Sequence, residues 1–222
     1  FKVYRQIHSG PSPELQMGKH LTAANFRNIA RVAGAIELVD DTGNSTTLGI
    51  LQEYIDNQND CWSFTLSYLE RFLDSCLVEP GQPGETSESE GVHELYLSRM
   101  QTLGQRIGRM HCILAEDTDD PAFKPEPIVD KDIQTWADNM EKTLLSTLEQ
   151  LAGRLADFSA ELQPLLANIT AHPDQMAKKM RAMIPAGVNL IKTRHHGDLH
   201  LGQILLVAND FNVSTVILSG GV

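Results

Sequence analysis

The feature that most constrains the fold is a long central region, residues 61–183, in which apolar side chains recur at steps of three and four. This spacing places them on one face of an α-helix. The expected helices cover residues 61–77, 93–114, 132–169 and 173–183. Gly153 and Pro164 are expected to break or bend the third of them, because neither residue is stable in the interior of a helix. The centre of the chain is therefore predicted to be helical.

The first 60 residues have a different pattern, in which short alternating runs are separated by turn residues. The expected strands cover residues 1–7, 35–39 and 48–54. In the first strand, Phe1 and Val3 are expected to face inward. Between the first two strands, Ser12 can cap a helix whose first residue is Pro13. These elements predict a small sheet with one helix.

The end of the chain returns to strands. These are expected at residues 204–207 and 213–218, with a turn at residues 208–210. Further upstream, the acidic run at residues 79–91 is rich in proline and glycine and is expected to be a mobile loop. The whole pattern predicts an α+β fold with a small mixed lobe, residues 1–60, and a mainly helical lobe, residues 61–222.

The composition argues against two classes of partner. The chain has 29 acidic and 18 basic residues, which gives a formal net charge of −11 at pH 7. Such a surface repels nucleic acid and anionic lipid, and no apolar run reaches the roughly 20 residues that a membrane span needs. The cysteines are Cys61, Cys76 and Cys112. This odd, widely spaced set lacks a C-x-x-C pair and favours reduced thiols in a cytoplasmic protein.

A polar loop at residues 194–203 carries the richest chemistry of the chain, with three histidines, an aspartate and a glutamine between apolar segments. It has three interpretations. One is a polar surface turn. A second is a zinc site made by His195, His196 and His200, although their spacing matches neither common zinc motif. The third is phosphotransfer, because Asp198 precedes Gln203 by five residues, the offset of the Asp and Asn in the kinase catalytic loop.

The chemistry of the third interpretation fits the two side chains. A carboxylate such as Asp198 can orient a substrate hydroxyl and accept its proton. A neutral amide oxygen such as that of Gln203 can bind Mg²⁺. The two glycines of the loop allow the backbone to fold tightly around a phosphate.

The stretch HHGDLHLGQILL, residues 195–206, resembles the catalytic loop of the aminoglycoside-phosphotransferase-like kinases. Its LHLGQ segment is similar to that of the maltokinase branch, whose members phosphorylate maltose with ATP and are often fused to trehalose synthase. Residues 1–5, 52–62 and 103–111 also resemble segments of this branch, so the likeness extends over most of the chain.

This resemblance implies a protein-kinase-like fold of two lobes, with ATP and Mg²⁺ as cofactors and maltose as the sugar substrate. It assigns Asp198 as the catalytic base and Gln203 as a metal ligand. The implied nucleotide-binding residues are Lys2 at the phosphates and Gln52, Glu53 and Tyr54 at adenine through their backbone groups. His196 and His200 would brace the loop by hydrogen bonds. Without the resemblance, Lys2 is more simply an ordinary exposed strand lysine.

The chain departs from the family pattern in two functional positions. A helix glutamate normally holds the ATP lysine, and the aligned residue here is Gln16. Glu14 lies on a different face of the expected helix, so we do not expect it to substitute. A second metal aspartate is expected after Leu218, where the chain has Ser219-Gly220-Gly221. We therefore expect a truncated piece of a kinase with little activity as written.

Two hypotheses remain open from the sequence. The first is an ATP-dependent kinase that converts maltose to maltose 1-phosphate, or the same chemistry on another acceptor; the charge of −11 would suit a cationic one. The second is a degenerate kinase-like module that regulates or scaffolds a trehalose synthase-type enzyme, to which Gln16 and Ser219 would point.

Overall fold

The computed structural model describes residues 1–5, 7, 9–10, 12–78, 87–185, 187 and 189–214, without the side chains of residues 78 and 87–92. The chain divides into two compact units. The first consists of Phe1–Phe123 and Arg194–Val222, and the second of Lys124–Thr193. Each unit is described by itself below.

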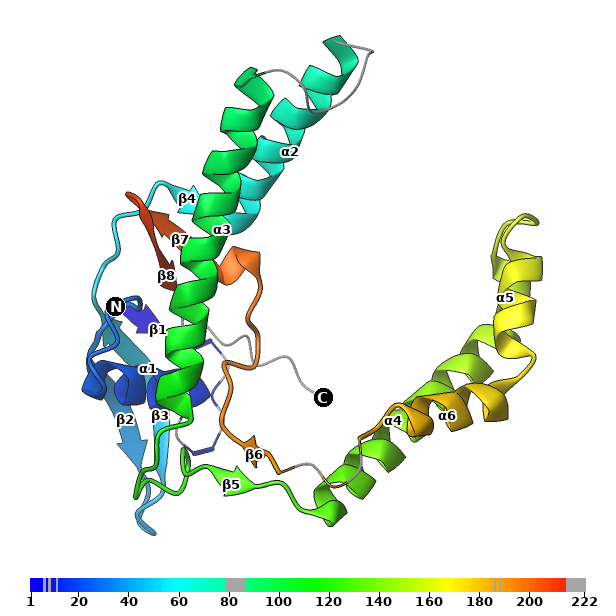
Figure 1. Cartoon of the computed structure of the whole chain (residues 1–222). Coiled ribbons are helices and arrows are strands. Elements are labelled where there is room, and N and C mark those ends of the chain that lie inside the picture. Colours follow the sequence, from blue (N-terminus) through cyan, green and yellow to red (C-terminus); the bar gives the residue numbers. More distant parts are fainter. Residues whose placement is uncertain are drawn as a thin grey trace. The chain divides into compact units, whose positions relative to one another are not determined.

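The first unit begins with a three-stranded antiparallel sheet and one helix (Figure 1). The strands are β1 (Lys2–Val3), β2 (Val32–Val39) and β3 (Ser45–Gln52), in the order β1-β3-β2. Helix α1 (Pro13–Ala23) starts at the predicted proline and packs next to β2. Its buried residues are Glu14, Leu15, Met17, Gly18 and Leu21. The predicted strand–helix–strand–strand order of this region is confirmed, with boundaries shifted by a few residues.

The orientation predicted for the first strand is wrong. Residues Phe1 and Val3 are exposed, and it is Lys2 that faces inward, because Lys2 lies opposite the fully buried Ile50 in the pairing of β1 with β3. Side chains alternate between the two faces of a sheet, so a pairing shifted by one residue exchanges the inner and outer sets. A Cβ at Gly49 would lie 2.7 Å from the Lys2 carbonyl oxygen, so β1 can approach β3 only at a glycine. Within the expected strand 1–7, Ile7 is exposed as well, and Gln6 lies outside the described residues.

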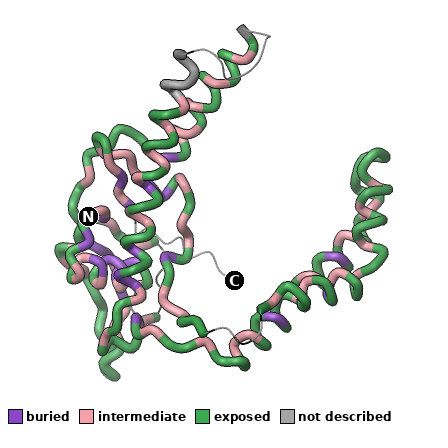
Figure 2. Tube along the Cα trace, in the orientation of Figure 1, coloured by how far each residue is buried: buried purple, intermediate pink, exposed green. Residues whose placement is uncertain are grey.

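Two long helices follow, α2 (Cys61–Val78) and α3 (Ser87–Leu114), which pack against each other. Asp60 caps α2 as expected, since its Oδ1 accepts a hydrogen bond of 2.8 Å from the Ser63 backbone N–H. Residues 87–91 are helical, so the expectation of a loop over 79–91 is wrong for them; residues 79–86 lie outside the described part. Figure 2 shows few buried positions along α2, where Trp62, Leu66 and Leu73 are exposed.

The core of the first unit joins these helices to a second small sheet. This sheet has strands β4 (Asn59–Asp60), β7 (Ile204–Val207) and β8 (Asp210–Val213), in the order β4-β7-β8. A hairpin is present here, but its second strand begins at Asp210 instead of Val213, because the turn takes only two residues; residues 215–218 of the expected strand lie outside the described part. The core cluster contains Met17, Leu21, Phe26, Ile29, Cys61, Leu103, Met110, Ile113, Leu114, Phe123, Ile204, Phe211 and Val213. It places α1 and the hairpin on one shared core.

The second unit is a helical group with a two-stranded ribbon, β5 (Glu126–Pro127) and β6 (Ile191–Lys192), at its base. The helices are α4 (Asp130–Gly153), the 3₁₀ turn η1 (Leu155–Asp157), α5 (Gln163–Thr170) and α6 (Pro173–Ala182). Gly153 ends α4 and Pro164 lies in the first turn of α5, as the sequence predicts. In the described parts of both units, no helix is long and apolar enough to cross a membrane.

Candidate functional site

The polar loop brings its two chemically important side chains together. Asp198 lies in the loop itself, and Gln203 ends the 3₁₀ turn η2 (Leu201–Gln203) that leads into β7. The Gln203 Nε2 donates a hydrogen bond of 3.5 Å to the Asp198 Oδ2. Gln203 is buried, whereas a third of the Asp198 side chain is exposed. The carboxylate can therefore meet a ligand from solvent, while the amide beside it is held in place.

His196 attaches the loop to the strand end beyond β8. It is 2% exposed, and its Nε2 donates a hydrogen bond of 2.6 Å to the Ser214 carbonyl oxygen. A carbonyl oxygen only accepts, so Nε2 carries the proton and Nδ1 is left as the acceptor. The Asp198 backbone N–H donates to that Nδ1 at 3.4 Å. Between them, Gly197 has φ +90°, a conformation that glycine adopts at little cost.

His200 shapes the next turn of the loop. Its Nδ1 accepts a hydrogen bond of 3.1 Å from the Gly202 N–H and so caps η2. A Cβ at Gly202 would lie 2.9 Å from the His200 ring, so a side chain there would displace the imidazole. The Nε2 of His200 lies 3.9 Å from the Asp198 Oδ2. The two histidines thus hold the backbone on either side of Asp198.

The zinc interpretation of the loop finds no support. Within the described residues, no three His, Cys, Asp or Glu side chains are arranged to hold a metal ion. Both ring nitrogens of His196 are engaged by backbone groups, at Ser214 and Asp198, and could not also ligate zinc. The polar-turn interpretation does not explain why His196 is buried, since surface turns are solvated.

A second polar centre lies between β1 and α1. The Lys2 Nζ is 2.7 Å from the Glu14 Oε2, and Glu14 is 1% exposed although it carries a charge. The expectation that Glu14 could not replace the family's lysine partner is therefore wrong. Glu14 and Gln16 do lie on different faces of the helix, but α1 turns the face of Glu14 inward.

The spacing of buried residues along α1 predicts a partner for Glu14, although the likeness to the kinase family points to Gln16 instead. Glu14 belongs to the same helical stripe as the buried Met17, Gly18 and Leu21, at steps of three, four and seven. A carboxylate on the apolar stripe of a short helix needs a cationic partner, because burying an unpaired charge is very unfavourable. Tyr4, which the sequence pattern does not single out, donates its hydroxyl to the same Glu14 oxygen at 2.8 Å.

The three expected adenine-contacting residues follow the end of β3. The Glu53 backbone N–H donates to the Arg31 carbonyl oxygen at 2.9 Å, so this donor is already engaged. Tyr54 is exposed, and in the described part of the chain its backbone N–H has no protein partner. Gln52 pairs with Val32 in the sheet. Backbone recognition of a base at this place would therefore use Tyr54 and the Glu53 carbonyl.

The loop fits a magnesium ion in part. A carboxylate and an amide oxygen are ligands that Mg²⁺ accepts, and Asp198 and Gln203 are adjacent. A half-turn of the Gln203 amide would present its oxygen in place of its nitrogen. The position expected for the second metal aspartate, Ser219, lies outside the described residues.

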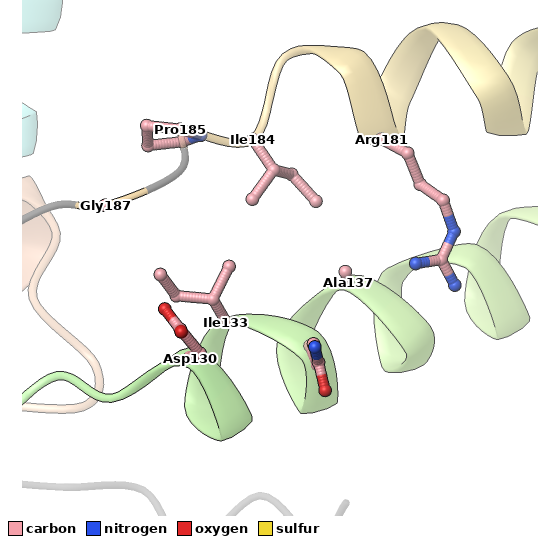
Figure 3. A pocket seen from close by; sticks show the side chains of 8 residues that line it. Asp130, Ile133, Ala137, Arg181, Ile184, Pro185 and Gly187 are labelled. Atoms are coloured by element: carbon pink, nitrogen blue, oxygen red, sulfur yellow. The ribbon is translucent and has the colours of Figure 1, made fainter.

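A hollow of about 460 Å³ lies in the second unit, between α4 and the end of α6 (Figure 3). It is lined by Asp130, Ile133, Gln134, Ala137, Arg181, Ile184, Pro185 and Gly187. The Arg181 guanidinium is ion-paired with Asp138 and Glu141. No residue that the sequence predicts to be functional lines this hollow.

Comparison with known proteins connects this geometry to a class of fold. No family model matches the chain. A glucosamine kinase structure matches over 95% of this chain with a TM-score of 0.58 and 19% identity. Another, a glucosamine kinase in complex with glucosamine, ADP and inorganic phosphate, matches over 92% with a TM-score of 0.57 and 20% identity. The chain shares the fold of these sugar kinases.

The shared fold covers only a part of the matched proteins. This chain spans 44% of the first glucosamine kinase and 41% of the second. At 19–20% identity the likeness establishes the fold, and the chemistry of this chain has to be argued from its own residues.

Proposed function

We propose that the polypeptide carrying this chain is an ATP-dependent sugar kinase, which transfers the γ-phosphoryl group of ATP to a hydroxyl of the sugar. One observation carries the proposal: the pairs Lys2–Glu14 and Asp198–Gln203 both form, and both belong to the first compact unit. A lysine held by a buried glutamate and a carboxylate beside an amide are the polar parts that phosphoryl transfer requires. The fold shared with glucosamine kinases supports the same class.

Each residue of the two pairs has a separate role in this proposal. Lys2 binds the ATP phosphates, and Glu14 holds its ammonium group in place. Asp198 orients the sugar hydroxyl and accepts its proton as the oxygen attacks phosphorus. Gln203 would hold Mg²⁺, which would neutralise negative charge on the phosphates. The residues lower the activation barrier mainly by positioning the reactants and by stabilising charge.

We propose maltose as the sugar and maltose 1-phosphate as the product. The support is the resemblance of LHLGQ, residues 199–203, and of residues 52–62 to maltokinases. The same resemblance supports a cytoplasmic setting and a fused or associated trehalose synthase. Glucosamine is the second candidate, because the matched solved structures are glucosamine kinases and because a net charge of −11 attracts a cationic amino sugar.

The structure weakens the case for a degenerate, non-catalytic module. That hypothesis depended on Gln16 standing where a glutamate is needed, and Glu14 supplies the carboxylate instead. Its other support, Ser219, lies outside the described residues. A catalytic role is therefore the better proposal.

The test is a phosphotransfer assay on the longest natural polypeptide that contains this chain. With ATP, Mg²⁺ and either maltose or glucosamine, we expect the phosphorylated sugar, with kcat/KM higher for maltose. Asp198→Asn should lower kcat by about 10³-fold, since it removes the base. Asp41→Asn, which alters an exposed carboxylate in the β2–β3 turn of the same unit, is the matched control and should leave kcat unchanged. Full turnover by Asp198→Asn would refute the assignment of the base.

A further inference from the structure

Tyr4 lies between the lysine and the start of helix α1. Its hydroxyl is 2.8 Å from the Glu14 Oε2 and 3.1 Å from the Ser12 Oγ. The Lys2 Nζ lies 5.3 Å from the centre of the Tyr4 ring, within the range of a cation–π contact. Lys2 and Tyr4 are two residues apart on an extended segment, so their side chains leave the same face.

The directions of these hydrogen bonds follow from the number of protons. A phenol has one proton, and an ionised carboxylate can only accept, so the Tyr4 O–H donates to Glu14. The Ser12 hydroxyl must then donate to the Tyr4 oxygen. The result is a chain of hydrogen bonds that runs from Ser12 through Tyr4 to Glu14. Ser12 begins this chain instead of capping α1, and its side chain makes no cap hydrogen bond.

The buried carboxylate depends on this chain of hydrogen bonds. Glu14 Oε1 has no hydrogen-bond partner among the described residues, so Oε2 receives both donors, Lys2 and Tyr4. A buried charge with few donors has little to hold its orientation when one of them is lost. If Glu14 holds the Lys2 ammonium while it binds a phosphate, the Tyr4 hydroxyl is the second donor that fixes the position of this carboxylate.

We infer that Tyr4 is a positioning residue for nucleotide binding: through its hydroxyl it holds Glu14, and through Glu14 it aims Lys2 at the phosphates of ATP. This inference rests on the proposed kinase function. It assigns to Tyr4 an effect on the nucleotide and none on the sugar, because Asp198 and Gln203 lie in a different loop.

The surroundings of Tyr4 keep its hydroxyl protonated, so that it can donate a hydrogen bond to Glu14. Burial raises the pKa of the Tyr4 phenol well above its usual value of 10.0; the hydrogen bond from Ser12 acts in the opposite direction, and the hydrogen bond to Glu14 and its charge raise the pKa further. The phenol therefore keeps its proton, and its hydrogen bond to Glu14, over the whole physiological pH range.

The experiment compares Tyr4→Phe with the unchanged protein, using the longest natural polypeptide that contains this chain. ADP and ATP binding are measured by isothermal titration calorimetry, and the KM values for ATP and for the sugar by steady-state kinetics. Tyr4→Phe keeps the ring and removes only the hydroxyl. We expect ATP binding about tenfold weaker, equivalent to about 1.4 kcal/mol, with the sugar KM unchanged.

The matched control is Tyr68→Phe. It removes another tyrosine hydroxyl, which is 2.6 Å from the His93 Nδ1 and lies between α2 and α3, away from Lys2. Tyr68→Phe should leave the affinity for ATP unchanged even if it lowers stability. Equal losses of ATP affinity in Tyr4→Phe and Tyr68→Phe would overturn the inference, because they would indicate a general loss of structure.

A double-mutant cycle with Glu14→Gln separates a positioning role from a direct one. If Tyr4 acts through Glu14, Tyr4→Phe should have no further effect on ATP affinity in the Glu14→Gln background. Additive losses would overturn the inference, and so would unchanged ATP affinity in Tyr4→Phe alone. Failure of the unchanged protein to bind any nucleotide would instead refute the proposed function, and this inference with it.

Ser12→Ala provides a second variant in case Tyr4→Phe does not fold. It removes the outer donor of the hydrogen-bond chain, so Tyr4 loses one of its two hydrogen bonds but keeps the one to Glu14. We expect ATP affinity to fall two- to threefold, again without a change in the sugar KM. No change in ATP affinity for Ser12→Ala, with Tyr4→Phe unfolded, would count against the inference.

Discussion

The two polar centres of the first unit are built in opposite ways. Asp198 and Gln203 are five residues apart and meet within one loop, whose shape depends on its own histidines and glycines. Lys2 and Glu14 belong to a strand and a helix, and they meet only because β1 pairs with β3 in one particular register. The first centre is therefore a local structure, and the second is a product of tertiary packing. Substitutions at the two centres should therefore affect activity and stability in different ways.

The largest effect is expected when the tertiary centre loses its cation. Lys2→Met should lower kcat/KM for ATP by about 10²- to 10³-fold, because the phosphates lose a direct charge and Glu14 is left buried without its ion pair. Steady-state kinetics with varied ATP measures the loss. Lys19→Met is the control, since Lys19 makes only a long, exposed ion pair with Glu37. If Lys2→Met kept the activity of the unchanged protein, Lys2 would not be the phosphate lysine.

The next prediction concerns the local centre, Asp198 and Gln203, and its dependence on the buried His196. His196→Ala removes a side chain that is 2% exposed, together with its hydrogen bonds to the Ser214 carbonyl and from the Asp198 N–H. We expect a loss of about 3 kcal/mol in the free energy of unfolding. Urea denaturation followed by circular dichroism measures it. His195→Ala, an exposed neighbour in the same loop, should change stability by less than about 0.5 kcal/mol. Similar losses in both variants would contradict the bracing role of His196.

A smaller effect concerns the turn that places Gln203. Gly202→Ala would bring a Cβ to 2.9 Å from the His200 ring, so the imidazole must shift and its cap on η2 weakens. We expect a destabilisation of about 1 kcal/mol, measured as a lower Tm. The contrasting variant is Gly104→Ala inside α3, where a Cβ meets nothing within 4 Å. Alanine should stabilise that helix by up to about 1 kcal/mol. An increase in Tm for Gly202→Ala would show that the turn does not need a glycine.

The smallest effect is a pH dependence at His20, which lies on the same helix as Glu14. His20 on α1 stacks on Phe123 at 3.9 Å, and the Arg194 guanidinium lies 4.9 Å from the same ring. Burial lowers the pKa of His20 below its usual value of 6.5, although Asp120 and Glu116 act in the opposite direction.

A histidine whose pKa is lowered by folding makes the folded protein less stable as the pH falls. The unfolded chain takes up a proton near pH 6.5, before the folded one does, so His20 lowers stability as the pH falls below that value. We expect His20→Gln to lose less stability than the unchanged protein between pH 7.5 and 5.5, by under about 1 kcal/mol. Urea titrations at the two pH values measure this difference. Parallel stability curves would mean that His20 titrates normally.

Much of the architecture could be predicted from the local pattern. The helices α2, α4, α5 and α6 begin and end within a few residues of their predicted limits, because caps, prolines and glycines act over one turn. The contact between Asp198 and Gln203 was predictable for the same reason: the five-residue step along one loop keeps the two side chains close in any compact turn. The mixed α and β composition was predictable as well, and the chain shares the fold of glucosamine kinase structures.

The local pattern could not supply the register of β1. A shift by one residue decides whether Lys2 and Tyr4, or Phe1 and Val3, face the helix, and both sets alternate equally well. The likeness to the kinase family also pointed to Gln16 as the lysine's partner position, and it is the burial of the other face of α1 that gives this place to Glu14. The secondary structure and the loop chemistry are thus encoded over a few residues at a time. The lysine–glutamate–tyrosine centre arises from the collective packing of strand, helix and core, because burying one face of each element is a property of all of them together.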